Sequence, residues 1–142
     1  MEILGINFDK QCSIIKHCKE REKIVYRRSA LIKKVGGKRW GANKKIKLQL
    51  YKQYIRPVLE YGNVVTSKSC ITAKGILGLA ERRALRSITR AEWGTSNEKL
   101  YQLAQIEKID ERIDRLAAYT WSKMQANETR WQVQIDRLKT LT

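Results

Sequence analysis

The sequence predicts a mainly α-helical protein, a bundle of about five helices with one short N-terminal strand. Three observations indicate this fold class. The 142 residues contain a single proline, and 42% of them are apolar. The apolar residues also recur at helical spacing over long stretches that no proline or cluster of turn residues interrupts.

Residues 2–8 are predicted to form the short strand, in which Gly5 allows another backbone to approach closely. A long helix is expected from about Ser13 to Val35. Its apolar positions, at spacings of four, seven, seven and three, are Ile14, Cys18, Val25, Ile32 and Val35. Gly36-Gly37 should end this helix, because glycine readily follows a last helical turn.

A second helix should begin after Asn43, a residue type favoured as an N-cap. Its inner face is predicted to comprise Ile46, Leu50, Tyr51, Tyr54 and Ile55. Tyr61 is expected to join Tyr51 and Tyr54 as a core residue whose hydroxyl reaches an edge. Pro57 should kink or end the helix, because proline lacks an N–H group and clashes with the preceding turn.

The third predicted helix runs from a cap at Thr72 to about Arg90, and its Gly75 and Gly78 suggest close packing against another helix. One broad arc of this helix is apolar and should face the core: Leu77, Ala80, Ala84, Leu85 and Ile88. The residues expected to be buried where the second and third helices meet are Leu50, Ile55, Leu77, Ala84, Leu85 and Ile88.

Trp93-Gly94 should break the third helix, and Thr95 with Glu98 fits a capping box for a fourth helix through Leu103. A fifth helix is predicted over about 109–126. Its inward residues are expected to be Ile113, Leu116, Ala117 and Met124. A last amphipathic turn or two should follow, with Trp131, Ile135 and Leu138.

The charge of the chain is unevenly distributed. The formal net charge is +16, and residues 1–94 hold 22 Lys and Arg against 7 Asp and Glu, a net of +15. Residues 95–142 hold 8 against 7, a net of +1. We therefore divide the chain into a basic helical domain, 1–94, and a near-neutral helical linker or appendage, 95–142. The basic part predicts a polyanionic partner, and a charge excess that only favours solubility is the alternative.

Several classes of function are not expected from this composition. The sequence contains no apolar run of membrane-spanning length and no signal-peptide pattern. The three cysteines are an odd number, which favours reduced thiols and an intracellular location, cytoplasmic or nuclear. His17, the only histidine, and the cysteines lack the spacing of a zinc site. We expect no cofactor, no metal ion, no membrane association and no small-molecule substrate.

The basic residues that could bind nucleic acid fall into three groups. The third helix, opposite its apolar arc, carries Arg82, Arg83, Arg86 and Arg90. One face of the first helix carries Lys16, Lys19, Lys23 and Arg27. The third group surrounds Trp40 in and after the 36–42 loop and comprises Lys38, Arg39, Lys44, Lys45 and Lys47. Guanidinium groups suit phosphate, and an aromatic residue among cations can stack on a base. The alternatives are solvated helix faces, a pairing of Glu20 with Lys23, and a core role for Trp40.

Four segments, in order, carry a resemblance to a known family: Ile3-Leu4-Gly5-Ile6-Asn7-Phe8-Asp9, Lys38-Arg39-Trp40-Gly41, residues 50–62 (LYKQYIRPVLEYG) and residues 81–89 (ERRALRSIT). Over residues 3–126 the chain resembles the region just downstream of the catalytic palm in non-LTR (LINE-like, jockey or RTE-type) retrotransposon reverse transcriptases. The resemblance implies a strand that closes the palm, followed by a thumb-like helical bundle that grips a template–primer duplex.

That resemblance also implies what is missing. The palm of such polymerases holds two metal ions on aspartates, one pair of them adjacent, and no Asp-Asp pair occurs here. We therefore expect a nucleic-acid-binding thumb module (RNA, DNA or an RNA–DNA hybrid) without catalysis of its own. One alternative is a structural or assembly subunit of a ribonucleoprotein particle, with a protein partner covering the strand edge at 2–8. Another is a fragment of an active polymerase whose palm is supplied separately.

Overall fold

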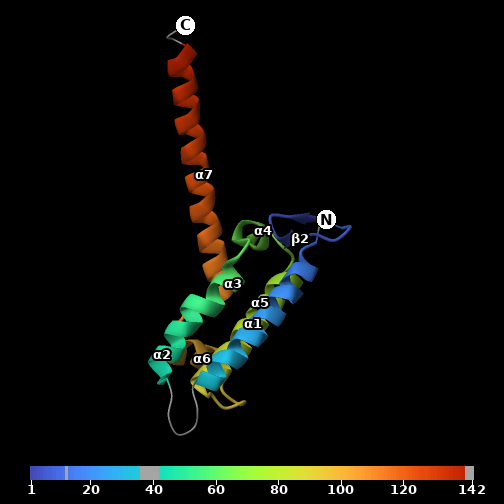
Figure 1. Cartoon of the computed structure of the whole chain (residues 1–142), viewed down its shortest axis with the longest axis vertical. Helices are drawn as coiled ribbons and strands as arrows, with labels where there is room; N and C mark the ends of the chain where they lie inside the picture. The colour runs from blue at the N-terminus through green and yellow to red at the C-terminus, as the bar shows by residue number, and fades with distance from the viewer. Residues whose placement is uncertain (12, 36–41, 140–142) are drawn as a thin grey trace.

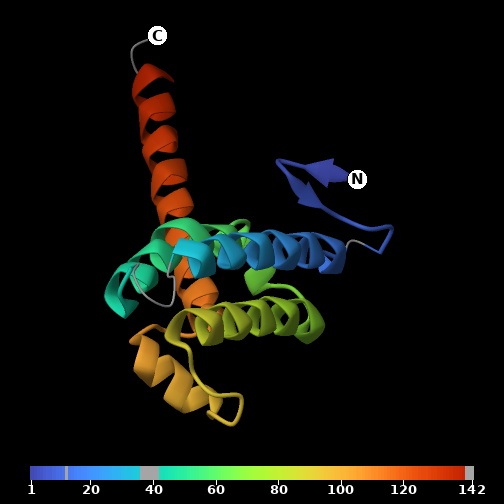
Figure 2. The same cartoon turned by 60° about the horizontal axis from the view of Figure 1, so that its bottom comes forward.

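The computed structural model describes residues 1–11, 13–35 and 42–139, but not the side chains of 131 and 133–139. The fold is mainly helical, which confirms the predicted fold class, and it begins with a short N-terminal β-hairpin (Figure 1). Two long helices, α1 (Ile15–Val35) and α5 (Ile71–Thr89), lie side by side. Most of the last helix, α7 (Ile109–Lys139), projects away from the bundle (Figures 1 and 2).

The N-terminal segment is a hairpin, so the prediction of one strand over 2–8 is wrong. Strand β1 (Glu2–Ile3) pairs antiparallel with β2 (Ile6–Asn7), and Ile3 lies opposite Ile6. Leu4 and Gly5, which join the strands, have φ angles of 49° and 73°. Two consecutive positive φ angles are what a tight two-residue hairpin turn needs, and Gly5 adopts one without strain. Strand β1 therefore has its mate within the chain, but in the described structure each strand is paired on one side only, so a protein partner along this edge stays a prediction.

Helix α1 (Ile15–Val35) confirms the first predicted helix. The hydroxyl of Ser13 accepts a hydrogen bond from the Ile15 N–H at 3.2 Å, which satisfies one backbone donor at the start of the helix. The predicted inward residues Ile14, Cys18, Val25 and Ile32 are buried, whereas Val35 is exposed. Val35 is the last residue of the helix, beyond the turn that packs on the core. Gly36-Gly37 lie outside the described residues.

The second predicted helix is present in three parts: α2 (Lys44–Leu50), the π-helical turn η1 (Tyr51–Ile55) and α3 (Arg56–Glu60). Asn43 is its N-cap, as predicted, and accepts a hydrogen bond from the Ile46 N–H at 3.0 Å. Pro57 lies in the first turn of α3, where its missing N–H is tolerated.

The predicted inner face of this segment is only partly correct. Tyr51 and Ile55 are fully buried and Leu50 is half-buried, but Ile46 and Tyr54 are exposed. A π-helical turn holds more residues than an α-helical turn, so a face that assumes one uninterrupted helical period fails across it.

After the short helix α4 (Asn63–Ser67), helix α5 (Ile71–Thr89) forms the centre of the bundle. Its N-cap position is Cys70 rather than Thr72, so the predicted start is two residues late. The whole predicted apolar arc is buried. At Gly78 a Cβ would lie 3.7 Å from Oδ2 of Asp110 on α7, an ordinary contact with another helix, and 3.1 Å from Nη1 of Arg82 on α5 itself. No described atom lies within 4 Å of that position at Gly75. The close packing expected at Gly75 is therefore wrong.

The last two helices are α6 (Asn97–Ala104) and α7 (Ile109–Lys139). Ser96, not Thr95, caps α6, because its hydroxyl accepts a hydrogen bond from the Lys99 N–H at 3.3 Å. Helix α7 continues well beyond the predicted residue 126. Along it Ile113 and Ala117 are buried and Leu116 is half-buried, whereas Met124 is exposed because the helix has left the bundle by that point. The predicted amphipathic side chains Trp131, Ile135 and Leu138 lie outside the described side chains.

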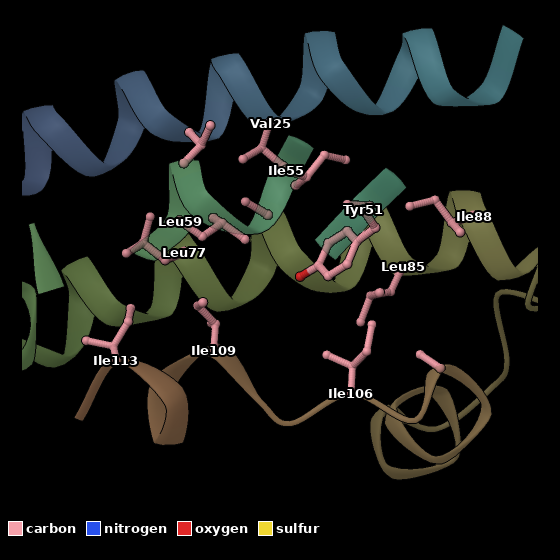
Figure 3. Packing of buried hydrophobic residues seen from close by; sticks show 14 of the residues in the cluster. Val25, Tyr51, Ile55, Leu59, Leu77, Leu85, Ile88, Ile106, Ile109 and Ile113 are labelled. Carbon is pink, nitrogen blue, oxygen red and sulfur yellow. The ribbon is translucent and has the colours of Figure 1, made fainter. Parts of the chain in front are cut away.

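The hydrophobic core is formed where α1, η1, α5 and the start of α7 meet. Figure 3 shows Val25, Ile55 and Leu77 converging from three elements, with Ile109 and Ile113 closing the far side of α5. The cluster thus includes residues from both sides of the 94/95 boundary. The division at residues 94 and 95 therefore reflects the distribution of charge, whereas the hydrophobic core extends across that boundary.

Candidate nucleic-acid interface

A stripe of cations runs along the solvent side of α1. The predicted residues Lys16, Lys19, Lys23 and Arg27 are all exposed, and Lys34 continues the same face two turns later. We call these five residues the α1 stripe. Its side chains share one face because they are spaced by three, four or seven residues on a single helix.

The two acids near the stripe are directed away from it. Glu20 was expected to pair with Lys23, but it accepts a hydrogen bond from Nδ2 of Asn7 on β2 at 2.6 Å. Glu22 accepts one from Nη1 of Arg83 on α5 at 2.8 Å. Both glutamates are half-buried. The charges that appear in sequence to dilute the stripe therefore belong to contacts with neighbouring elements.

On another flank of α1, two arginines cover two tyrosines that the sequence analysis placed in the core. The guanidinium carbon of Arg21 lies 4.4 Å from the ring centroid of Tyr61, and that of Arg28 lies 4.3 Å from the centroid of Tyr54. Tyr61 and Tyr54 are 44% and 42% exposed, so a core role is wrong for both. An arginine over an aromatic face contributes cation–π attraction and stiffens the contact between α1 and the 44–61 segment.

The arginines of α5 are less open than the sequence suggested. Arg83 and Arg90 are exposed, whereas Arg82 and Arg86 are half-buried. The guanidinium of Arg86 donates to the backbone oxygen of Thr95 at 2.9 Å and to Oδ1 of Asn97 at 3.0 Å. These bonds hold the connection between α5 and α6, so Arg86 has a structural role whether or not it also meets phosphate.

The third predicted group is only partly visible. Lys38, Arg39 and Trp40 lie outside the described residues, so their predicted role stays a prediction. Lys44 and Lys45 are exposed at the start of α2, where phosphate can reach them. Lys47 is buried, which removes it from any open surface.

Glu81, which directly precedes Arg82 and Arg83 in the sequence, is fully buried at the junction of four elements. Its carboxylate accepts hydrogen bonds from the hydroxyls of Tyr51 and Tyr101 at 2.8 and 2.9 Å and from the Ile109 N–H at 2.9 Å. Burial raises the pKa of Glu81, although these three donors and the charge of Arg56 act in the opposite direction. The same burial, with the adjacent carboxylate, raises the pKa of Tyr51 and of Tyr101.

A signal for Glu81 was present in the sequence. It stands four residues after Leu77 and four before Leu85, inside the predicted apolar arc of α5. An ionisable residue in such an arc is expected to be paired, and tyrosines are suitable donors. The partners themselves come from α6, α7 and η1, which no local pattern connects.

Further reactive side chains that the structure describes lie on α1 and at the start of α7. His17 is buried on α1, and burial together with the charge of Arg21 lowers its pKa. Burial raises the pKa of the Cys18 thiol to about 11. Of the acids at the start of α7, Asp114 pairs with Lys74 at 3.0 Å, and burial raises the pKa of Asp110. Within the described part of the chain, no three His, Cys, Asp or Glu side chains are grouped so as to hold a metal ion.

Across the residues with described positions, none of the helices combines the length and apolarity needed to cross a bilayer. No protein-family model, no curated protein and no solved structure matches this chain. The resemblance to retrotransposon reverse transcriptases therefore stays a prediction based on the four sequence segments.

Proposed function

We propose that this chain is a nucleic-acid-binding helical module, akin to the thumb of a non-LTR retrotransposon reverse transcriptase, that holds a template–primer duplex or structured RNA by its backbone. The observation that carries the proposal is the α1 stripe, five exposed cations on one helical face whose neighbouring acids are bound elsewhere. The chain performs no chemistry of its own in this proposal.

The geometry of the stripe suits a phosphate backbone. From Lys16 to Lys34 it extends about 27 Å along the helix axis, at ~1.5 Å per residue. Cations about one turn apart can each neutralise a phosphate and release its counterion, which is the main source of affinity in backbone recognition. Contacts of this kind carry no base information, so affinity should vary little with sequence.

The test is salt-dependent binding by wild type and two charge-matched triple variants. Replacing Lys16, Lys19 and Lys23 by Gln should weaken duplex binding and reduce the magnitude of the log K against log salt slope by about 2–3. The control variant replaces Lys99, Lys123 and Arg130 by Gln, which gives the same change in net charge. These three residues are exposed cations in the near-neutral part of the chain. A small effect of the control would assign the contacts to α1 rather than to overall charge.

Two results would contradict the proposal. One is a flat salt response in the wild-type protein, and the other is an equal loss of affinity in both triple variants. A primer-extension assay with added magnesium tests the non-catalytic part separately. Extension by the purified chain would refute it, since the proposal assigns no carboxylate pair to hold two metal ions.

A second candidate function is a structural subunit of a larger ribonucleoprotein complex. The projecting part of α7 favours it, because this part exposes Tyr119, Trp121 and Met124 outside the bundle. In this case Trp121→Ser with Met124→Ser should release the chain from its native complex while the α1 triple variant stays bound. Mass spectrometry of that complex also tests the polymerase-fragment alternative, which requires a companion polypeptide with an adjacent Asp pair.

A further inference from the structure

Tyr26 is an exposed aromatic residue at the edge of the α1 stripe. The residue is 76% exposed, and it lies seven residues after Lys19, three after Lys23 and seven before Lys33. On a helix these spacings place all four residues on neighbouring parts of one surface. Lys33 is exposed, as are Lys19 and Lys23.

Tyr26 differs from the other five tyrosines of the chain, all of which have described partners. Tyr51 and Tyr101 are buried and donate to Glu81. Tyr54 and Tyr61 lie beneath guanidinium groups, and Tyr119 has an ammonium group 6.0 Å from its ring centroid. Tyr26 therefore keeps an open ring beside the α1 stripe.

The neighbours of Tyr26 along α1 leave its ring accessible. Side chains of a helix lean toward its N-terminus, so the residue that would cover Tyr26 from the following turn is Ala30, which offers only a methyl group. On the preceding turn, Glu22 is bound to Arg83. A planar group can therefore approach the ring of Tyr26 without breaking the ion pair between Glu22 and Arg83.

We infer that Tyr26 is a stacking site for an unpaired base, while Lys19, Lys23 and Lys33 hold the adjoining phosphates. This inference rests on the proposed function and narrows its ligand to nucleic acid with a single-stranded segment at α1. An aromatic ring among cations is the arrangement by which proteins bind single strands, since every base has a π face and every nucleotide a phosphate. A base inside a duplex presents no free face, so Tyr26 distinguishes unpaired from paired nucleotides.

The experiment uses the full chain and two probes of one sequence. The first probe is a single strand of about 12 nucleotides, a length within the range of known single-strand binding sites, and it carries one 2-aminopurine flanked by thymines. The second probe is the blunt-ended duplex of the same sequence. Anisotropy gives the affinities, and 2-aminopurine fluorescence reports stacking. The variants are Tyr26→Ala, Tyr26→Phe and Tyr119→Ala, the last a matched control because Tyr119 is 63% exposed on α7.

Tyr26→Ala should weaken single-strand binding about 5- to 150-fold, the range for loss of one stacked base, and should remove the 2-aminopurine quenching. Duplex affinity should change less than about twofold and the salt slope should not change, because no charge is removed. Tyr26→Phe and Tyr119→Ala should both bind like wild type.

The inference is overturned if Tyr26→Ala binds the single strand as tightly as wild type, or if it loses single-strand and duplex affinity equally. In either case salt-dependent binding by the wild type would leave the proposed function standing. A wild-type protein that binds neither probe, with no salt response, would overturn both. Because Tyr26 is exposed, the variant should keep its helical circular dichroism, which confirms that a lost affinity is local.

Discussion

Replacing Glu81 by alanine should cost the fold about 3 kcal/mol or more. The substitution removes the acceptor of three buried hydrogen bonds, those from Tyr51, Tyr101 and the Ile109 N–H. A buried donor left without a partner costs about 1–3 kcal/mol, so three at the lower limit sum to about 3 kcal/mol. If the three unpaired donors cost more than this lower limit, part of the cost is offset, because alanine removes the free-energy penalty of burying a carboxylate.

The assay is chemical denaturation at neutral pH, followed by circular dichroism, with Glu81→Gln as the matched control. Glutamine keeps one oxygen for Tyr101 and Ile109, and its amide can donate to the hydroxyl oxygen of Tyr51. The control should therefore lose under about 1.5 kcal/mol, the net value of one hydrogen bond. A loss below about 0.5 kcal/mol for Glu81→Ala, the norm for a surface position, would refute the buried junction.

Three further outcomes are expected. Because burial raises the pKa of Glu81, the native state keeps the carboxyl proton at pH values where the unfolded chain has released it. Wild type should therefore gain stability relative to Glu81→Gln as the pH falls from neutral toward 4.5, the ordinary pKa of the group. Denaturation at stepped pH measures this difference, and the opposite slope would contradict the prediction. Leu85→Ala should cost about 2–5 kcal/mol in the same assay, since Leu85 is fully buried, and a surface-like loss would mean that the wrong face of α5 points inward. Arg86→Gln should cost about 1–2 kcal/mol and accelerate amide exchange at residues 92–97, because it removes the charged donor to Thr95 and Asn97, and unchanged exchange would refute that role.

The sequence predicted the helices well where one period covers a whole element. The arc of α5 from Leu77 to Ile88 and the outward face of α1 from Lys16 to Arg27 follow from the repeat of about 3.6 residues, a local property. The cap at Asn43 is equally local, because the bond it makes reaches only three residues along the chain. Local prediction failed at η1, where a π-helical turn interrupts the period and leaves Tyr54 exposed.

The candidate interface divides in the same way. The sequence alone determined that residues 1–94 are strongly basic and that Lys16, Lys19, Lys23 and Arg27 share one helical face, because composition and spacing along one helix do not depend on other elements. It could not determine whether acids nearby in sequence weaken that face. Glu20 is bound by Asn7 of the hairpin and Glu22 by Arg83 of α5, and both partners come from other elements.

Only the tertiary structure decided which polar groups are buried and which aromatic rings are covered. Glu81 became the junction of η1, α5, α6 and α7, Arg21 and Arg28 covered Tyr61 and Tyr54, and Tyr26 was left open. The physical reason is that apolar periodicity specifies which side of a helix avoids water but not which element meets it there. Hydrogen-bond partners and ring contacts between distant segments exist only once those elements have packed.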